Sequence, residues 1–175
     1  MARVLTFSTK FPSWHTCAGN STLFIEQFWA SVLTRSSVAD LYMLNPGKDP
    51  SDIEKVRGKI DYLGIEDFHS KNHTIRSGNR WKVGDLFSPR VWSDVPYYSP
   101  QIIIAKDQRV EKTWKFEVRR KKNGELLYLL QNRKLSEGQL ITIAHNDGLH
   151  IVDFKEWFNK PFKGQVICWN KEINY

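Results

Sequence analysis

The chain of 175 residues carries a net charge of +7, and 41% of its residues are hydrophobic and 13% aromatic. This length suits a single domain over residues 1–175 with a core of its own, and the composition excludes a disordered chain. The positive charge favours a polyanionic partner such as nucleic acid, or an anionic ligand, but it fixes neither a fold nor an activity.

The beginning of the chain shows no long apolar segment, and no stretch approaches the ~18 apolar residues of a membrane span. We therefore expect a cytoplasmic protein without membrane contact, in which Cys17 and Cys168 stay reduced. His15 and Cys17 offer two metal ligands, but no second closely spaced pair completes a site. The sequence thus indicates no metal and no cofactor.

The first third of the chain predicts one strand and two helices. Residues 3–8 are β-prone, and a loop follows them. A helix with its cap at residues 20–21 comes next, because apolar residues then recur at three- and four-residue spacing. These residues are Ile25, Phe28, Trp29, Val32 and Leu33. A second helix is expected to start at residues 49–50 and to end near Leu63.

The middle of the chain holds a basic stretch that we expect to form a strand, followed by a Gly-Asp turn at residues 83–85. Lys71 and His73 then lie on one face of the strand, because side chains alternate. Thr74 and Arg76 lie on the other face. A lysine near a hydroxyl and an arginine can hold a polar ligand or activate a nucleophile. The alternative is that these side chains are merely solvated, as is usual on a half-exposed strand.

Three further strands are predicted after this turn. Residues 87–92 form the first, with Pro89 at an edge or a bulge. The loop at residues 93–100 is rich in proline and tyrosine, and its rings can either stack on a base or close one end of the fold. Residues 102–104 are continuously β-branched, which indicates a buried strand. Residues 113–118 alternate in the manner of a half-buried antiparallel strand.

A hairpin and a helix are predicted next. Asn-Gly at residues 123–124 is the strongest hairpin signal in the chain, and residues 125–130 are expected to return as the partner strand. The capping-box pattern at residues 136–139 predicts a helix that ends before the Asn-Asp-Gly turn at residues 146–148. The β-branched residues 141–143 favour a strand instead.

A helix starting near Asp153 and a strand at residues 164–169 complete the order. The whole chain thus predicts about six strands, mostly in sequential hairpins, and three to four helices. We interpret this as an α+β fold, an antiparallel and partly closed β-barrel with helices packed on its sides and ends.

The basic strand resembles the motif of a known family. The pattern Lys71-x-x-Thr74-x-Arg76, followed by the Gly-Asp turn and a return strand, is similar to the signature of ASCH domains, which are members of the PUA-like superfamily. In that family's motif, Gly-x-Lys-x-x-x-x-Arg, the spacing from lysine to arginine matches, but His69 stands in place of the glycine. The resemblance spans most of the chain and implies a PUA-like barrel.

The resemblance implies that the chain binds RNA or a modified nucleoside in a basic cleft between barrel and helices. Lys71 and Arg76 would meet phosphates, and aromatic rings, including Tyr97, would stack on bases. The candidate ligand-binding residues are Arg76, His73, Arg90, Trp81, Trp92, His145 and His15. A protein-interaction domain with a vestigial cleft is a further alternative.

The resemblance also implies a second function, because some ASCH proteins are similar to amidohydrolases that deacylate N4-acetylcytidine with a lysine, a threonine and a carboxylate. These roles fall on Lys71, Thr74 and Asp147, although the family pattern has Glu at the last position. A desolvated Lys71 would take the proton of Thr74, and Asp147 would pass a proton to the leaving amine. His73 or His145 could replace Asp147, and Asn-Asp-Gly is also a common turn sequence. The sequence leaves open whether the chain is an enzyme.

Overall fold

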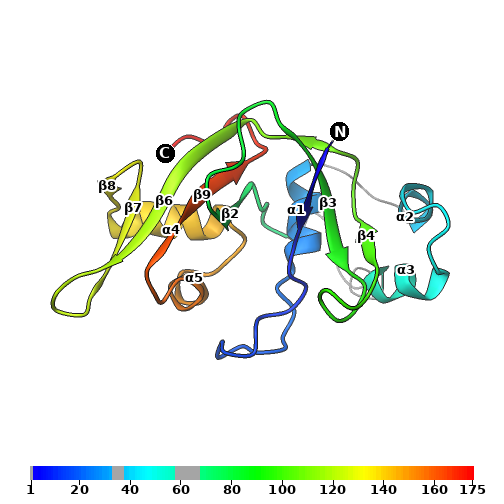
Figure 1. Cartoon of the computed structure of the whole chain (residues 1–175), viewed down its shortest axis with the longest axis horizontal. Coiled ribbons are helices and arrows are strands. Elements are labelled where there is room, and N and C mark those ends of the chain that lie inside the picture. Colours follow the sequence, from blue (N-terminus) through cyan, green and yellow to red (C-terminus); the bar gives the residue numbers. More distant parts are fainter. Residues whose placement is uncertain (1, 33–37, 58–67) are drawn as a thin grey trace.

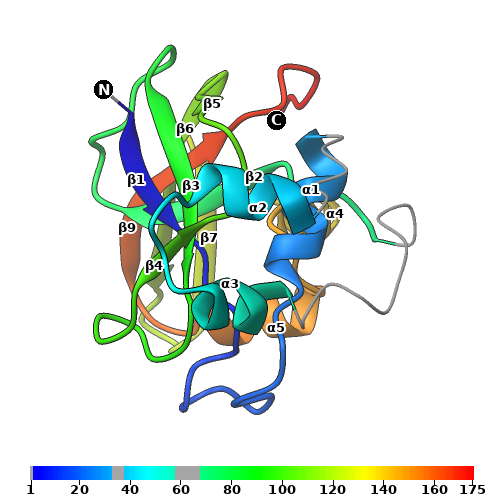
Figure 2. The same ribbon diagram turned by 90° about the vertical axis from the view of Figure 1, so that its right-hand side faces the viewer.

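Nine strands and five helices form an α+β fold over the part of the chain that the computed structural model describes, residues 2–32, 38–57 and 68–175 (Figure 1). The strands lie in two sheets, and Figure 2 shows most of the helices gathered on one side of them. The helices are α1 (Phe24–Val32), α2 (Val38–Leu44), α3 (Pro50–Arg57), α4 (Glu137–Asn146) and α5 (Ile151–Trp157). The strands are β1 (Arg3–Thr6), β2 (His73–Ser77), β3 (Leu86–Trp92), β4 (Gln101–Ile103), β5 (Gln108–Arg109), β6 (Lys112–Arg120), β7 (Leu126–Leu130), β8 (Arg133–Lys134) and β9 (Phe162–Cys168).

The first sheet is built around β3, which pairs with β1 on one side and with β4 and β5 on the other. The β1–β3 pair is parallel, so the expectation of antiparallel pairing holds only for the other pairs of this sheet. Pro89 lies in this central strand and not at an edge, between the residues that pair with β4 and those that pair with β5. Its missing N–H therefore coincides with an interruption of the ladder on that side.

The second sheet has β9 near its centre, between β2 and β6, although β9 is the last strand of the described chain. β6 also pairs with β7, and their hairpin turns at Asn123 and Gly124 as predicted. Gly124 adopts φ +85°, a left-handed conformation that favours glycine. β8 pairs with β7 at the edge of the sheet.

The capping box predicted at the start of α4 is present. Ser136 Oγ accepts the Gln139 N–H at 3.3 Å, and the Ser136 N–H donates to Gln139 Oε1 at 2.9 Å. This reciprocal cap satisfies two donors at the helix end, and the alternative of a strand at residues 141–143 is wrong. α5 begins at Ile151, slightly earlier than the predicted start near Asp153.

α1 supplies a large part of the core. Phe28 and Trp29 are fully buried, which confirms the predicted apolar face, although Leu33 lies outside the described residues. α3 starts at Pro50 as predicted, and its expected end near Leu63 also lies outside them. α2 was not predicted. Within the described ranges, no helix combines the length and the apolar character needed to cross a membrane.

Candidate functional site

The basic strand and the Asn-Asp-Gly bend, which are far apart in the sequence, lie side by side. The Lys71 N–H donates to the Gln27 carbonyl at 2.9 Å, and the Asn72 N–H donates to the Asn146 carbonyl at 2.8 Å. Lys71 Nζ then donates to the carboxylate of Asp147 at 2.7 Å and to its backbone carbonyl. The side chain of Lys71 is only 1% exposed, so the two segments meet at an ion pair inside the protein.

Asp147 is held in place by the end of α4. Its N–H donates to the Ile143 carbonyl at 2.9 Å, and Gly148 follows with φ +80°. A Cβ atom on Gly148 would collide with the side chain of Gln27 in α1. The glycine therefore lets the end of α4 approach α1, and this approach brings Asp147 to Lys71.

Burial disfavours charge on both members of this pair. It lowers the pKa of Lys71 to about 8, although the attraction to Asp147 opposes the change. It raises the pKa of Asp147, with Lys71 again opposing. His73 Nδ1 lies 3.8 Å from Asp147 Oδ1, and burial, followed by the charge of Lys71, holds the pKa of His73 well below its usual value. The pair is thus nearer its neutral form than an exposed pair, and a neutral lysine can act as a base.

Thr74, on β2, is buried but makes no hydrogen bond to the Lys71–Asp147 pair. Within the described ranges, no hydrogen bond connects Thr74 with Lys71 or Asp147. The three residues that the hydrolase alternative requires are therefore all buried, and two of them are in contact. A substrate amide can reach them only through a rearrangement of the side chains around them.

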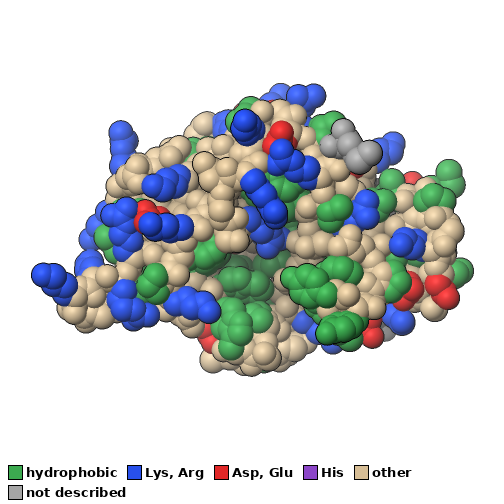
Figure 3. Space-filling model, in the orientation of Figure 1, with side chains coloured by type: hydrophobic (Ala, Val, Ile, Leu, Met, Phe, Trp, Pro, Cys, Tyr) green, Lys and Arg blue, Asp and Glu red, His purple; other side chains and the backbone are tan. Residues whose placement is uncertain are grey.

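An open cleft of about 410 Å³ lies between the end of β1 and the loop that joins β3 to β4. The rings of Trp92 and Tyr97 in its wall are 5.4 Å apart, and Tyr97 is 86% exposed. Figure 3 shows the hollow near the middle of this face, with Lys and Arg side chains above it and hydrophobic side chains beside it. The cleft is lined by residues 6–12, Arg76, Trp92, Asp94, Pro96 and Tyr97. It thus combines a basic group with accessible aromatic rings.

Arg76 connects this cleft with the buried pair. Its guanidinium donates to the Thr6 carbonyl and lines the cleft. Burial lowers the pKa of Arg76, and the charge of Asp147 opposes the change. An arginine remains protonated in spite of such a shift, so Arg76 presents a fixed positive charge between the interior and the cleft.

The remaining candidate residues lie elsewhere. Trp81 is buried in the core, and Arg90 is half-buried on β3. His145 is exposed and stacks on His69, with 4.4 Å between the ring centroids. His15 lies in the loop after β1, against α5. The structure therefore does not gather all the predicted ligand-binding residues in one place.

Of those predicted residues, Arg76 and Trp92 line the cleft. The contributions of residues 6–12 and Asp94 were not predicted. Residues 6–12 join the cleft because β1 pairs in parallel with β3, and parallel pairing leaves no turn motif in the sequence by which it could be found. The only signal was the β-prone character of residues 3–8.

Comparisons of the chain with protein-family models, with curated proteins and with solved structures find no match. The expected relation to ASCH domains therefore depends on the motif of the basic strand. The function has to be argued from the cleft and the buried pair.

Proposed function

We propose that this chain is a PUA-like, ASCH-type domain that binds RNA or a modified nucleoside in the cleft beside Arg76. The α+β architecture and the pattern Lys71-x-x-Thr74-x-Arg76 support this assignment. Residues of both sheets, such as Phe87 and Phe116, belong to a single hydrophobic core, as a partly closed barrel requires.

The observation that carries the proposal is that Arg76 and the Trp92–Tyr97 ring pair share one cleft. Within the described ranges the guanidinium of Arg76 makes one hydrogen bond, to the Thr6 carbonyl, so its other N–H groups remain available to a phosphate or a base carbonyl. An exposed aromatic ring offers a stacking surface worth about 1–3 kcal/mol per base.

The size and the charge of the cleft suit such a ligand. A volume of about 410 Å³ falls in the range of ~300–1,000 Å³ that is usual for small-molecule sites. The net charge of +7 favours the encounter with a polyanion. The carboxylate of Asp94, in the wall of the cleft, can accept a hydrogen bond from the amino group of a base. This contact would favour bases that carry an amino group over bases that do not.

The test is a binding titration with short single-stranded RNA and, separately, with nucleosides that include N4-acetylcytidine, at low and at moderate salt. Arg76→Ala should weaken binding, and with RNA it should also flatten the salt dependence, because a phosphate contact is lost. The matched control is Arg120→Ala, at the end of β6 in the β6–β7 hairpin, and it should change the affinity little. No measurable affinity of the folded wild type at low salt, or equal weakening by both variants, would contradict the proposal.

The second candidate function is amide hydrolysis of an N4-acylated cytidine, and the contact between Lys71 and Asp147 favours it. Neutral Lys71 would take the Thr74 hydroxyl proton while Oγ attacks the amide carbon, and Asp147 in its protonated form would give a proton to the leaving amine. Water would then hydrolyse the acyl-threonine ester. This chemistry requires Thr74 to come within reach of Lys71 when substrate binds.

Turnover of N4-acetylcytidine by the wild type, by Lys71→Ala and by Thr74→Val distinguishes the two functions. Hydrolysis requires that both variants lose activity while they remain folded by circular dichroism. Binding without turnover in the wild type supports the first function alone, and activity that survives in Lys71→Ala excludes the proposed base.

A further inference from the structure

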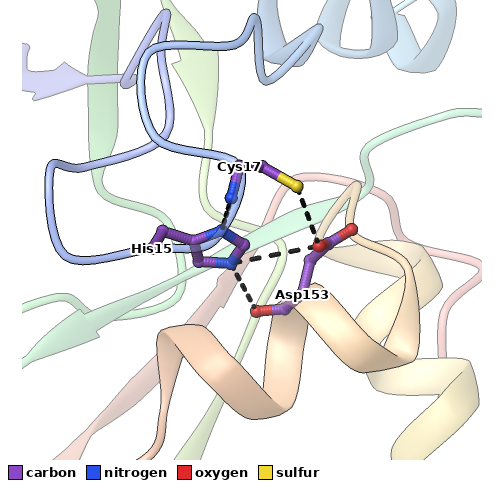
Figure 4. A group of neighbouring side chains, drawn as sticks. All are labelled: His15, Cys17 and Asp153. Atoms are coloured by element: carbon purple, nitrogen blue, oxygen red, sulfur yellow. Dashed lines mark hydrogen bonds and ion pairs between the residues drawn. The ribbon is translucent and has the colours of Figure 1, made fainter.

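A second group of polar side chains lies apart from the Lys71–Asp147 pair, where the loop after β1 meets α5. His15, Cys17 and Asp153, which we call the His15 cluster, each offer one metal-ligand atom, and these atoms lie within 4.8 Å of one another (Figure 4). Because 136 residues separate Cys17 from Asp153, the sequence showed only the His-x-Cys half of this cluster.

Local bonds hold the two halves together. Thr16, between the two loop ligands, donates its N–H at 2.7 Å and its hydroxyl at 2.6 Å to the carboxylate of Glu156. Asp153 and Glu156 are three residues apart on α5, so both point towards the loop. The loop therefore presents His15 and Cys17 to the face of α5 that carries its two acids.

The distances are close to those of a tetrahedral zinc site. Cys17 Sγ lies 3.8 Å from Asp153 Oδ1, and His15 Nε2 lies 4.0 Å from the same oxygen. Zinc bonds of ~2.0–2.3 Å place neighbouring ligand atoms about 3.3–3.8 Å apart, so these two distances need only a small contraction. Cys17 Sγ and His15 Nε2 lie within 4.8 Å of each other and approach by up to about 1 Å when both bind the ion. Glu156 Oε2 lies 3.6 Å from His15 Nε2, beside the position that the ion would occupy.

The surroundings allow a metal ion to enter and to be retained. The side chain of His15 is fully buried, with its ring stacked at 4.5 Å on Phe11. Cys17 and Asp153 are partly exposed, which leaves a path from solvent. One thiolate and one carboxylate would offset the charge of a divalent ion, and a sulfur–nitrogen–oxygen set suits zinc better than magnesium or calcium.

We infer that the His15 cluster binds a zinc ion through His15 Nε2, the Cys17 thiolate and the Asp153 carboxylate. A water molecule completes the coordination and donates to Glu156. The site is independent of the proposed nucleoside function, although the loop that it ties to α5 continues from residues 6–12 of the cleft wall.

Binding changes the hydrogen bonds of His15. The Cys17 N–H donates to Nδ1 at 3.1 Å, so a neutral ring carries its proton on Nε2, which faces the Asp153 backbone carbonyl at 3.3 Å. When zinc takes Nε2, this proton is displaced and the ring keeps a proton on Nδ1, so the contact with the Cys17 N–H opens. Zinc binds the thiolate form of cysteine, so binding also displaces the proton of the Cys17 thiol.

The test uses the reduced chain of residues 1–175 with Zn²⁺ and with Co²⁺ as a spectroscopic substitute. Equilibrium dialysis should give one Zn²⁺ per chain, and Co²⁺ should produce visible bands of a tetrahedral ion and a near-ultraviolet thiolate-to-metal band. Cys17→Ser should abolish the thiolate band, and Asp153→Asn should lower the affinity for Zn²⁺ at least tenfold.

The second of the two cysteines provides the matched control. Cys168 is buried in β9, and burial raises the pKa of its thiol to about 11, so Cys168→Ala should leave the band unchanged. Less than stoichiometric Zn²⁺ in the folded wild type, or a thiolate band that persists in Cys17→Ser, would overturn the inference. Neither result bears on nucleoside binding, which is measured without metal.

Discussion

Lys71 and Arg76 belong to the same basic stretch and are both shielded from water, yet only Arg76 lines the cleft. Lys71 is buried against Asp147, and burial lowers its pKa to about 8. Arg76 reaches the cleft, where it is charged and has N–H groups to offer. The difference shows that the role of a basic residue in a motif, either stabilising the fold or binding a ligand, depends on which other residues cover it. The predictions below test this contrast, from the largest expected effect to the smallest.

Removing the carboxylate should harm stability most. Asp147→Ala leaves the charge of Lys71 buried without a partner, and the free energy of unfolding should fall by about 3–5 kcal/mol. Urea unfolding followed by circular dichroism measures this loss. Asp107→Asn, at an exposed position, should change stability by less than ~0.5 kcal/mol.

The double variant Lys71→Met, Asp147→Leu sharpens the same test. An apolar pair of similar size removes both buried charges, so most of the stability lost in Asp147→Ala should return. A double variant as unstable as Asp147→Ala would show that these two side chains stabilise the fold through interactions other than the attraction between their charges.

The pH dependence of stability should reveal the lowered pKa of Lys71. Between its folded pKa of about 8 and the ordinary value of ~10.4, the unfolded chain binds more protons at this lysine than the folded chain does. Its contribution to the free energy of unfolding is therefore lowest below pH 8 and rises, by at most about 3 kcal/mol, as the pH increases towards 10. The measurement is the difference between the wild type and Lys71→Met at each pH. A flat difference would mean that Lys71 titrates as an exposed lysine does.

Two glycines with similar backbone angles should differ in their tolerance of a side chain. Gly148→Ala should cost about 2 kcal/mol, because it adds a collision with Gln27 to the left-handed strain, and it should displace Asp147 from Lys71. Gly124→Ala carries the strain alone, since no atom lies near its added Cβ, and should cost about 1 kcal/mol. Thermal unfolding of the two variants compares them directly, and equal losses would argue against close packing at Gly148.

A substitution in the cleft should lower ligand affinity and hardly change stability, whereas a substitution in the buried pair should lower stability. Tyr97→Ala removes an exposed ring, so affinity for single-stranded RNA or a nucleoside should fall by about 1 kcal/mol, roughly fivefold, while stability hardly changes. Fluorescence anisotropy measures the affinity, with Tyr98→Ala, an equally exposed neighbour that does not line the cleft, as control. If Tyr98→Ala weakens binding as much, the ligand does not stack in the cleft.

Local motifs predicted the elements that depend on neighbouring residues. The hairpin at Gly124 and the capping box at Ser136 both form, because each is fixed by bonds or angles within a few residues. The parallel β1–β3 pair and the place of Pro89 in a central strand could not be predicted. They depend on partners far along the chain, about which a local pattern carries no information.

The candidate site was predicted in part for the same reason. The basic strand was recognised, and it lies beside Asp147 as expected. The exposure of Lys71 and Arg76 to solvent depends on how α1 and the loop after β1 cover them. The alternation of side chains along a strand cannot predict this coverage. Asp153 was likewise predicted only as a helix residue, because its proximity to Cys17 exists only after folding.

The central position of β9 has a consequence for how the chain is made. Among the described strands, β2 pairs only with β9, and β6 pairs with β7 on one edge and with β9 on the other. β2 therefore has no partner, and one edge of β6 stays unpaired, until the ribosome has released residues 162–168. Until then both strands expose open edges of the kind on which nascent chains aggregate. Truncation before Phe162 should therefore yield insoluble protein and not a smaller folded unit.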